Sequence, residues 1–174
     1  MLSIIIPARD ESENLEQILN YFSEGLKTID YEVILINDFS GDDTFEKASK
    51  LFEGKQNFKI FNNKRKGLGG AINLGIEKCS GTKVSIMMAD LSDDVEDLKR
   101  YNNLIDQKNL DAVLGSRFSK GSRVIDYPFQ KLILNRIFNF FVSIIFWNNY
   151  NDYTNAFKIY KTDVLKNLLP LVSE

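Results

Sequence analysis

The feature that most constrains the fold is a repeated alternation between short apolar runs and amphipathic segments. Four runs rich in β-branched or aromatic residues are each followed by a polar loop and a stretch with helical periodicity. These runs span residues 3–7, 31–36, 58–61 and 83–88, and a shorter one follows at 111–115. Strand–helix units with short connections predict a mostly parallel sheet, because each crossover helix packs back onto the sheet it left. We therefore expect an α/β fold of three layers, with helices on both faces of the sheet.

Composition excludes several classes of protein. The chain has 174 residues, of which 44% are hydrophobic, and this is enough for one well-buried core. A net charge of -2 provides no excess of basic residues for nucleic acid, so we expect no nucleic-acid partner. There is no histidine, and Cys79 is the sole cysteine, which excludes histidine-dependent catalysis and an internal disulfide. Acid–base or metal chemistry must therefore rest on carboxylates.

The two ends of the chain bear on its extent. No basic segment precedes the first apolar run, so residues 1–7 do not have the pattern of a secretory signal. No run reaches the roughly 18 apolar residues that a membrane span needs. The last residues, 168–172, are still apolar, which suggests a piece of a longer protein. We expect one domain over residues 1–174, truncated at its C-terminus.

Polar residues follow the strands at the edge where parallel sheets bind ligands. Residues 7–11 follow the first run, Asp38 follows the second and Asp90 follows the fourth, so we expect them to line one crevice. The acids after Asp90 serve the next helix, with Asp93 and Glu96 as a capping box. Asp90 lies before that helix and has no capping role. A carboxylate placed there suits a hard divalent cation bound against a nucleoside diphosphate.

A glycine-rich stretch, residues 67–71, precedes the third expected helix. Glycines at a helix N-terminus let backbone amides approach phosphate oxygens, which makes Gly67 and Gly69 candidates for contact with a phosphate group. The spacing matches neither a Walker loop nor the dinucleotide fingerprint. A tight turn with close packing is the alternative explanation.

The chain becomes basic after residue 115. Five basic residues and one acid lie between residues 116 and 136: Arg117, Lys120, Arg123, Lys131 and Arg136, with Asp126. This segment would hold an anionic group, and Arg117 is suited to bidentate contact with phosphate. A solvated basic face is the alternative.

A long apolar helix is predicted over residues 129–147. Asn135, Asn139 and Ser143 recur on it at a spacing of four, so they share one face, while phenylalanine and isoleucine fill the others. Such a helix is too apolar for an ordinary surface element. It is either core against the sheet or a helix that lies in a membrane interface.

Six segments in order resemble family 2 glycosyltransferases of the GT-A fold, most closely the dolichol-phosphate-mannose-synthase-like branch. They span residues 5–14, 36–40, 67–71, 88–92, 115–118 and 152–158. The resemblance implies a Rossmann-like sheet and an inverting transfer of a sugar from a UDP- or GDP-sugar to a polyprenyl (dolichyl or undecaprenyl) phosphate. Two alternatives remain: a hydroxyl acceptor in polysaccharide or lipopolysaccharide synthesis, and nucleotide-sugar binding without catalysis.

The resemblance also implies roles for individual residues. It places the donor against Pro7, Ala8, Arg9, Glu11, Asp38, Gly67, Gly69, Ala89 and Asp90. Asp90 would be a catalytic residue and the ligand of Mg²⁺ or Mn²⁺. The acceptor phosphate would meet Arg117, Lys131 and Asn135, and Asn139 matches a further acceptor-side position. Arg117 and Asp152 would also be catalytic, Asp152 at the start of a loop that closes over the sugar beside Thr154.

Two departures from the family pattern concern this site. Met88 stands where the family has the first carboxylate of its Asp-X-Asp motif, and Asn37 replaces the first of two paired aspartates. Asp90, water and the donor phosphates would then hold the cation, a ligand set that magnesium and manganese accept.

The chemistry of the acceptor bears on the choice between the alternatives. A phosphate monoester is mostly ionised near pH 7, so it needs no catalytic base, and this supports the lipid-phosphate acceptor. We accordingly expect a membrane surface as a partner. The expected location is the cytoplasmic side of the membrane, with the chain peripheral or anchored by a region absent from it.

Overall fold

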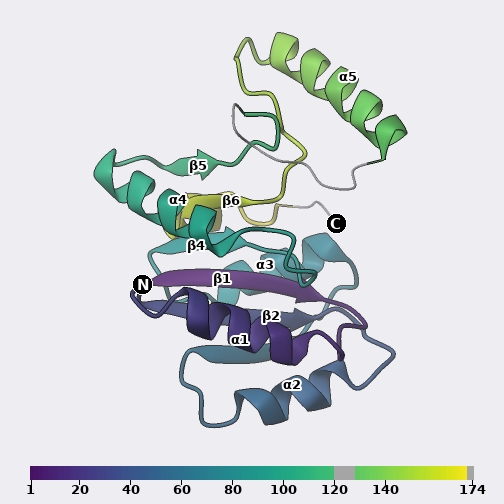
Figure 1. Ribbon diagram of the computed structural model, residues 1–174, viewed down its shortest axis with the longest axis vertical. Helices are drawn as coiled ribbons and strands as arrows, with labels where there is room; N and C mark the ends of the chain where they lie inside the picture. The colour runs from purple at the N-terminus through teal and green to yellow at the C-terminus, as the bar shows by residue number, and fades with distance from the viewer. Residues whose placement is uncertain (120–127, 172–174) are drawn as a thin grey trace. The chain divides into compact units, whose positions relative to one another are not determined.

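A computed structural model describes residues 1–119 and 128–171 (Figure 1). The predictions for Lys120, Arg123 and Asp126 lie outside the described residues. The strands are β1 (Leu2–Ala8), β2 (Tyr31–Asn37), β3 (Phe58–Asn62), β4 (Lys83–Ile86), β5 (Ala112–Leu114) and β6 (Lys158–Lys161). The helices are α1 (Leu15–Gly25), α2 (Thr44–Phe52), α3 (Leu68–Lys78), α4 (Val95–Gln107), α5 (Phe129–Ile145) and α6 (Thr162–Asn167). The predicted α/β class is confirmed.

The strands form one sheet in the order β3-β2-β1-β4-β6-β5. β1 pairs in parallel with β2 and β4, and β2 pairs in parallel with β3, as the strand–helix alternation predicts. All seven residues of β1 are buried, because a central strand of a covered sheet has no solvent face. β4 ends at Ile86, two residues earlier than predicted.

Strands β5 and β6 depart from the parallel pattern. The Lys161 amide donates to the Asp111 carbonyl, and the Gly115 amide donates to the Phe157 carbonyl. Residue numbers therefore rise along β5 while those of the paired residues in β6 fall, so this pair is antiparallel. The sheet is mostly, not wholly, parallel.

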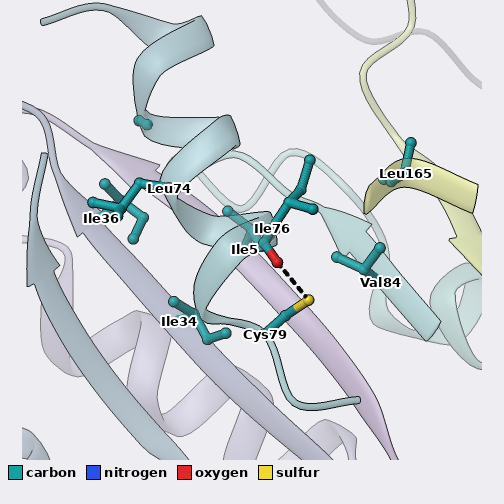
Figure 2. Packing of buried hydrophobic residues seen from close by; sticks show 9 residues of the cluster. Ile5, Ile34, Ile36, Leu74, Ile76, Cys79, Val84 and Leu165 are labelled. Atoms are coloured by element: carbon teal, nitrogen blue, oxygen red, sulfur yellow. Dashed lines mark hydrogen bonds between the residues drawn. The ribbon is translucent and has the colours of Figure 1, made fainter. Parts of the chain in front are cut away.

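One cluster of the core lies between α3 and the sheet (Figure 2). Ile5 of β1 and Ile36 of β2 are fully buried there against Leu74 of α3. Helix α3 comes very close to β1, because a Cβ atom added at Gly75 would lie 2.4 Å from Cγ2 of Ile5. Figure 1 shows α1 on the opposite face of the sheet from α3, so the sheet is covered on both sides.

We expect Gly75→Ala to lower the free energy of unfolding by about 1–3 kcal/mol, because overpacking forces α3 away from Ile5. Urea unfolding followed by circular dichroism measures this. Glu77→Ala on the exposed face of the same helix is the control, with a change within about 0.5 kcal/mol. Equal stability of the two variants would contradict the close packing of α3 on β1.

The chain divides into two compact units. The first comprises Met1–Val113 and Ile159–Glu174, and the second comprises Leu114–Lys158. The first unit contains nearly all of the sheet, and the second contains helix α5 with the loops on either side of it.

Candidate active site

In the first unit, the polar residues predicted for the donor lie at one edge of the sheet. Strands β1, β2 and β4 run in parallel, so their carboxyl ends meet there. Pro7 and Ala8 are buried at the end of β1, and the Asp38 amide donates to the Ala8 carbonyl at 2.8 Å. Arg9 is exposed in the loop that follows. The structure thus places the ends of β1 and β2 side by side.

The loop after β1 is tied to the loop after β2 by a ladder of hydrogen bonds. Backbone amides donate from Asp10 to Ser40 Oγ at 3.0 Å, from Glu11 to Thr44 Oγ1 at 2.9 Å and from Ser12 to Asp42 Oδ2 at 3.2 Å. The Thr44 hydroxyl and the amides of Thr44 and Ser12 lower the pKa of Asp42 to about 2. The ionised Asp42 carboxylate therefore has a structural role, because it holds the two loops together.

Asp38 is buried and shapes the turn before α3. Its two carboxylate oxygens accept from the Gly67 amide at 2.9 and 3.1 Å, and Oδ1 also accepts from Asn63 Nδ2 at 2.7 Å. Gly67 has a φ of 111°, a conformation that a side chain disfavours. The Asp38 carboxylate thus fixes the turn at Gly67. A contact between Asp38 and the nucleoside stays a prediction.

Asn63 was not identified from the sequence. It is buried, and besides Asp38 its Nδ2 donates to the Arg65 carbonyl at 2.6 Å, while its Oδ1 accepts from the Arg65 amide at 3.2 Å. The signal that could have found it is its position: it directly follows β3, as Asp38 directly follows β2. Both residues therefore shape the same edge.

The glycine stretch combines a turn with close packing. A Cβ atom at Gly70 would lie 1.9 Å from the Arg65 carbonyl oxygen, so only glycine fits there. Gly67 is the residue before α3 and Gly69 lies in its first turn, where backbone amides have no partner within the helix. The packing explanation holds for Gly70, and phosphate contact at Gly67 and Gly69 stays a prediction.

Asp90 lies at the same edge, four residues beyond β4. Its side chain is exposed, and its Oδ1 accepts from the Ser92 amide at 3.0 Å. Ala89 before it is buried, and Leu91 after it has a φ of 55°. This tight turn presents the carboxylate to solvent at the end of a buried strand.

The predicted capping box of Asp93 with Glu96 is wrong. Helix α4 begins at Val95, and Asp94 caps it, accepting from the Glu96 amide at 2.8 Å. Tyr21 explains the difference, because its hydroxyl donates to the Asp93 carbonyl at 2.9 Å and accepts from the Val95 amide at 2.8 Å. Anchoring of this backbone by α1 makes Asp94 the capping residue.

Asp90 is suited to a cation whose other ligands come from a bound diphosphate and water. Within residues 1–119 and 128–171, no three His, Cys, Asp or Glu side chains gather into a metal site. Asp90 is an exposed carboxylate with one oxygen engaged by a backbone amide. Mg²⁺ and Mn²⁺ are commonly held by one or two carboxylates together with substrate phosphates and water. Asp90 therefore fits such a cation when a diphosphate supplies the other ligands.

In the second unit, Arg117 and Asp152 form a tightly held ion pair. Asp152 is fully buried, and its Oδ2 accepts from both the backbone amide and Nε of Arg117, each at 2.9 Å. Arg117 Nη2 donates to Asp152 Oδ1 at 2.7 Å and to Thr154 Oγ1 at 3.0 Å. Asp152 thus occupies the Nε edge of the guanidinium and fixes its plane. This geometry favours a positioning role for Asp152, whose direct role in catalysis stays a prediction.

Aromatic and basic groups surround this pair. The guanidinium carbons of Arg117 and Arg136 lie 5.6 and 4.8 Å from the centre of the Phe118 ring. Burial lowers the pKa of Lys158, whose Nζ donates to the Tyr153 carbonyl at 3.1 Å. Two guanidinium groups over one ring make this end of the second unit strongly basic.

Helix α5 exposes most of its apolar side chains and buries two asparagines. Its large apolar residues are exposed: Phe129, Ile133, Leu134, Ile137, Phe138, Phe140, Phe141, Ile144 and Ile145. Asn135 and Asn139 are its buried residues, and Lys131, one turn before Asn135, is exposed. The two environments predicted for α5, core against the sheet and a membrane interface, stay predictions. Asn135 is linked to Arg117 through Thr154, whereas Lys131 lies apart from this network.

Comparison with known families and curated proteins identifies relatives. The model of glycosyl transferase family 2 matches residues 3–169. A dolichol-phosphate mannosyltransferase of Pyrococcus furiosus is 33% identical over 135 residues, which are 78% of this chain and 38% of that protein. The glycosyltransferase AglD of Haloferax volcanii is 25% identical over 172 residues, 96% of this chain and 27% of that protein. The chain thus spans well under half of these relatives.

Solved structures share the fold at low sequence identity. Staphylococcus aureus TarS 1-349 in complex with UDP-GlcNAc has a TM-score of 0.64 at 21% identity, covering 95% of this chain and 46% of that chain. Mycobacterium tuberculosis glucosyl-3-phosphoglycerate synthase in complex with Mn²⁺, UDP and phosphoglyceric acid has a TM-score of 0.66 at 16% identity, covering 95% of this chain and 57% of that chain.

Proposed function

Because this chain belongs to glycosyl transferase family 2 and has the GT-A fold, we propose that it transfers a sugar from a nucleoside diphosphate to a polyprenyl phosphate. The first unit would bind the donor, and the second would bind the acceptor. The relative named as a dolichol-phosphate mannosyltransferase supports a lipid phosphate as acceptor. Transfer would proceed with inversion at the anomeric carbon, by attack of the acceptor opposite the departing diphosphate.

The observation that carries the proposal is the pairing of two features within the second unit. Arg117, fixed by the buried Asp152, is a guanidinium suited to phosphate, and helix α5 of the same unit exposes an apolar face. A polyprenyl phosphate carries the matching groups, an anionic head and a hydrocarbon tail. A soluble sugar acceptor has no hydrocarbon group that could contact the apolar face of α5.

The state of Asp152 supports a phosphate nucleophile. A hydroxyl acceptor needs a base to remove its proton, whereas a phosphate monoester is already ionised near pH 7. Asp152 is buried, and both of its oxygens accept hydrogen bonds from Arg117, so it is poorly placed to act as that base. Attack by an acceptor that needs no base fits this arrangement.

On the donor side, Asp90 would hold Mg²⁺ or Mn²⁺ together with the donor diphosphate, as its exposure allows. The cation supplies charge neutralisation for the departing nucleotide. The backbone at Ala8 and the turn that Asp38 fixes at Gly67 would bind the nucleoside and the phosphates of a UDP- or GDP-sugar.

A product-partition assay tests the proposal. The protein is incubated with radiolabelled UDP- and GDP-sugars, Mn²⁺ and membranes that contain polyprenyl phosphate, and the label is then counted in each phase. Label in the organic extract is the expected result. Label only in a water-soluble glycan would favour the hydroxyl-acceptor alternative, and nucleotide binding without any transfer would favour a binding module.

A membrane surface is the partner we propose for α5. The helix carries the basic residues Lys131 and Arg136 and no acidic residue, which favours an anionic lipid surface. In the part of the chain that the structure describes, no helix is long and apolar enough to cross a bilayer. We propose that the protein acts on the cytoplasmic side of the membrane, because its single cysteine, Cys79, suits a reducing compartment.

Trp147 provides a probe of this surface. It is the sole tryptophan, it lies two residues beyond the end of α5 and its side chain is 91% exposed. We expect its fluorescence to shift to the blue when vesicles containing anionic lipid are added, because the indole enters an apolar interface. Phe141→Asp should weaken vesicle binding about tenfold or more, since it removes a large apolar side chain from the exposed face that would enter the membrane.

Leu168→Asp serves as the matched control, because Leu168 is also exposed but lies beyond α6 in the first unit. Its vesicle binding should equal that of the unmodified protein. Equal loss in both variants would contradict binding through α5. A dimer that forms without vesicles and is broken by Phe141→Asp would show that a second copy covers this face instead.

A further inference from the structure

Helix α5 buries Asn135 and Asn139 and exposes its large apolar side chains, the reverse of an ordinary surface helix. Asn139 is the most buried residue of this polar face, with 2% of its surface exposed. Burying an amide costs free energy unless its donors and acceptor are paired. Its partners therefore indicate what the buried face does.

Both ends of the Asn139 amide are engaged. Its Nδ2 donates to the Asn135 carbonyl at 2.8 Å and to Asn135 Oδ1 at 2.7 Å. Its Oδ1 accepts from the Tyr153 backbone amide at 2.6 Å. Asn139 thus joins two turns of α5 to the loop that carries Asp152. An amide engaged in this way is not available to an acceptor molecule.

A continuous set of hydrogen bonds leads from Asn139 to the guanidinium. Because Asn135 Oδ1 accepts from Asn139, the Asn135 Nδ2 is turned towards Thr154 and donates to its Oγ1 at 2.5 Å. The same Thr154 oxygen accepts from Arg117 Nη2 at 3.0 Å. Through Tyr153, Asn139 also anchors the backbone next to Asp152. Two routes therefore connect it with the groups that orient Arg117.

We propose that Asn139 is a positioning residue for the acceptor phosphate, which it serves by setting the direction of the Arg117 guanidinium. The proposal rests on the proposed function for the identity of the acceptor. It replaces the direct acceptor contact that sequence resemblance implies for this position. It also explains why α5 buries asparagines. Their hydrogen bonds orient Arg117, while the opposite side of the same helix exposes apolar residues.

The test compares three variants. Asn139→Leu has a similar volume and removes all of the amide's hydrogen bonds, whereas Asn139→Asp keeps an acceptor for the Tyr153 amide and loses the donor to Asn135. Ser143→Ala is the control, because Ser143 lies one turn further along α5 and its hydroxyl donates within the helix to the Phe140 carbonyl at 2.8 Å. Circular dichroism confirms that each variant is folded.

The kinetic readout is the KM for polyprenyl phosphate. We expect Asn139→Leu to raise it about tenfold, with a smaller rise for Asn139→Asp, no change for Ser143→Ala and an unchanged donor KM. An equal rise in the donor and acceptor KM values would overturn the proposal, since a general structural defect has that signature. If Asn139→Leu does not fold, the same comparison is decided on Asn139→Asp.

A second readout does not depend on activity. In the unmodified protein, the Arg117 Nε–H donates to a buried carboxylate, so its exchange with water, measured by nuclear magnetic resonance, should be slow. We expect exchange to be at least about tenfold faster in folded Asn139→Leu. An unchanged rate would overturn the positioning role. Absence of transfer in the unmodified protein would instead overturn the proposed function, while the exchange rates would still decide the role of Asn139.

Discussion

Asp90→Asn is expected to lower kcat/KM for sugar transfer by about a thousandfold, the largest effect of any single substitution in the first unit. Asp90 is the exposed carboxylate at the end of β4, and the residue two positions before it is Met88. No second carboxylate of an Asp-X-Asp pair is there to compensate for the lost charge. An amide binds a divalent cation far more weakly than a carboxylate does, so neutralisation of the departing diphosphate is lost.

The matched control is Asp94→Asn, the same chemical change four residues away. Asparagine caps a helix about as well as aspartate does, so the bond to the Glu96 amide and the start of α4 are kept. Its kcat/KM should stay within about twofold of the unmodified value. Initial rates at saturating Mn²⁺ measure both variants, and full activity in Asp90→Asn would refute a metal role for this residue.

Asp152→Asn is expected to destabilise the protein by about 3 kcal/mol and to reduce transfer strongly. Asp152 is fully buried, and Arg117 donates to it from three nitrogen atoms. An amide nitrogen in place of one carboxylate oxygen would oppose a guanidinium donor and leave a charge without its partner. Urea unfolding followed by circular dichroism measures the loss of stability.

An exposed ion pair provides the comparison for this variant. Asp111 binds Lys161 at 3.2 Å, but its side chain is 76% exposed. Asp111→Asn makes the same chemical change where water screens the charges, so the free energy of unfolding should change by no more than about 0.5 kcal/mol. Similar losses in the two variants would show that the Arg117–Asp152 pair is not specially important to the second unit.

The sheet was predictable from sequence because its signal is local and repeated. Apolar runs such as residues 31–36 can be buried only as covered strands, and the helix after each run fixes the parallel direction. The family resemblance, which rests on six short segments in order, is confirmed by the match over residues 3–169. The antiparallel pairing of β5 with β6 was not predicted, since it depends on where the chain returns after α5.

Side-chain partners across long sequence separations were not predictable. Asp93 was chosen as the cap of α4 from spacing alone, but Tyr21, 72 residues earlier, holds that backbone and moves the cap to Asp94. The pairing of Arg117 with Asp152 spans 35 residues. The basic segment identified Arg117 and the family resemblance identified Asp152, yet neither gave a sign that the two residues would bind each other.

The environment of α5 was only half determined by its sequence. The spacing of Asn135 and Asn139 showed that they share a face, and the apolar residues excluded an ordinary surface helix. Which face is buried depends on partners in residues 153 and 154, and these come after the helix. Polar groups with specific partners took the inner side, so the apolar residues were left exposed.

The most direct test of the central claim offers the protein two acceptors that differ only in the phosphate: a polyprenyl phosphate and the corresponding polyprenol. Donor, Mn²⁺ and lipid are held the same, and the initial rate of label transfer into the organic phase is measured. We predict transfer to the polyprenyl phosphate and none above background to the polyprenol, because only the phosphate is ionised and can bind Arg117. Equal transfer to both acceptors, or transfer to the polyprenol alone, would contradict the proposed function.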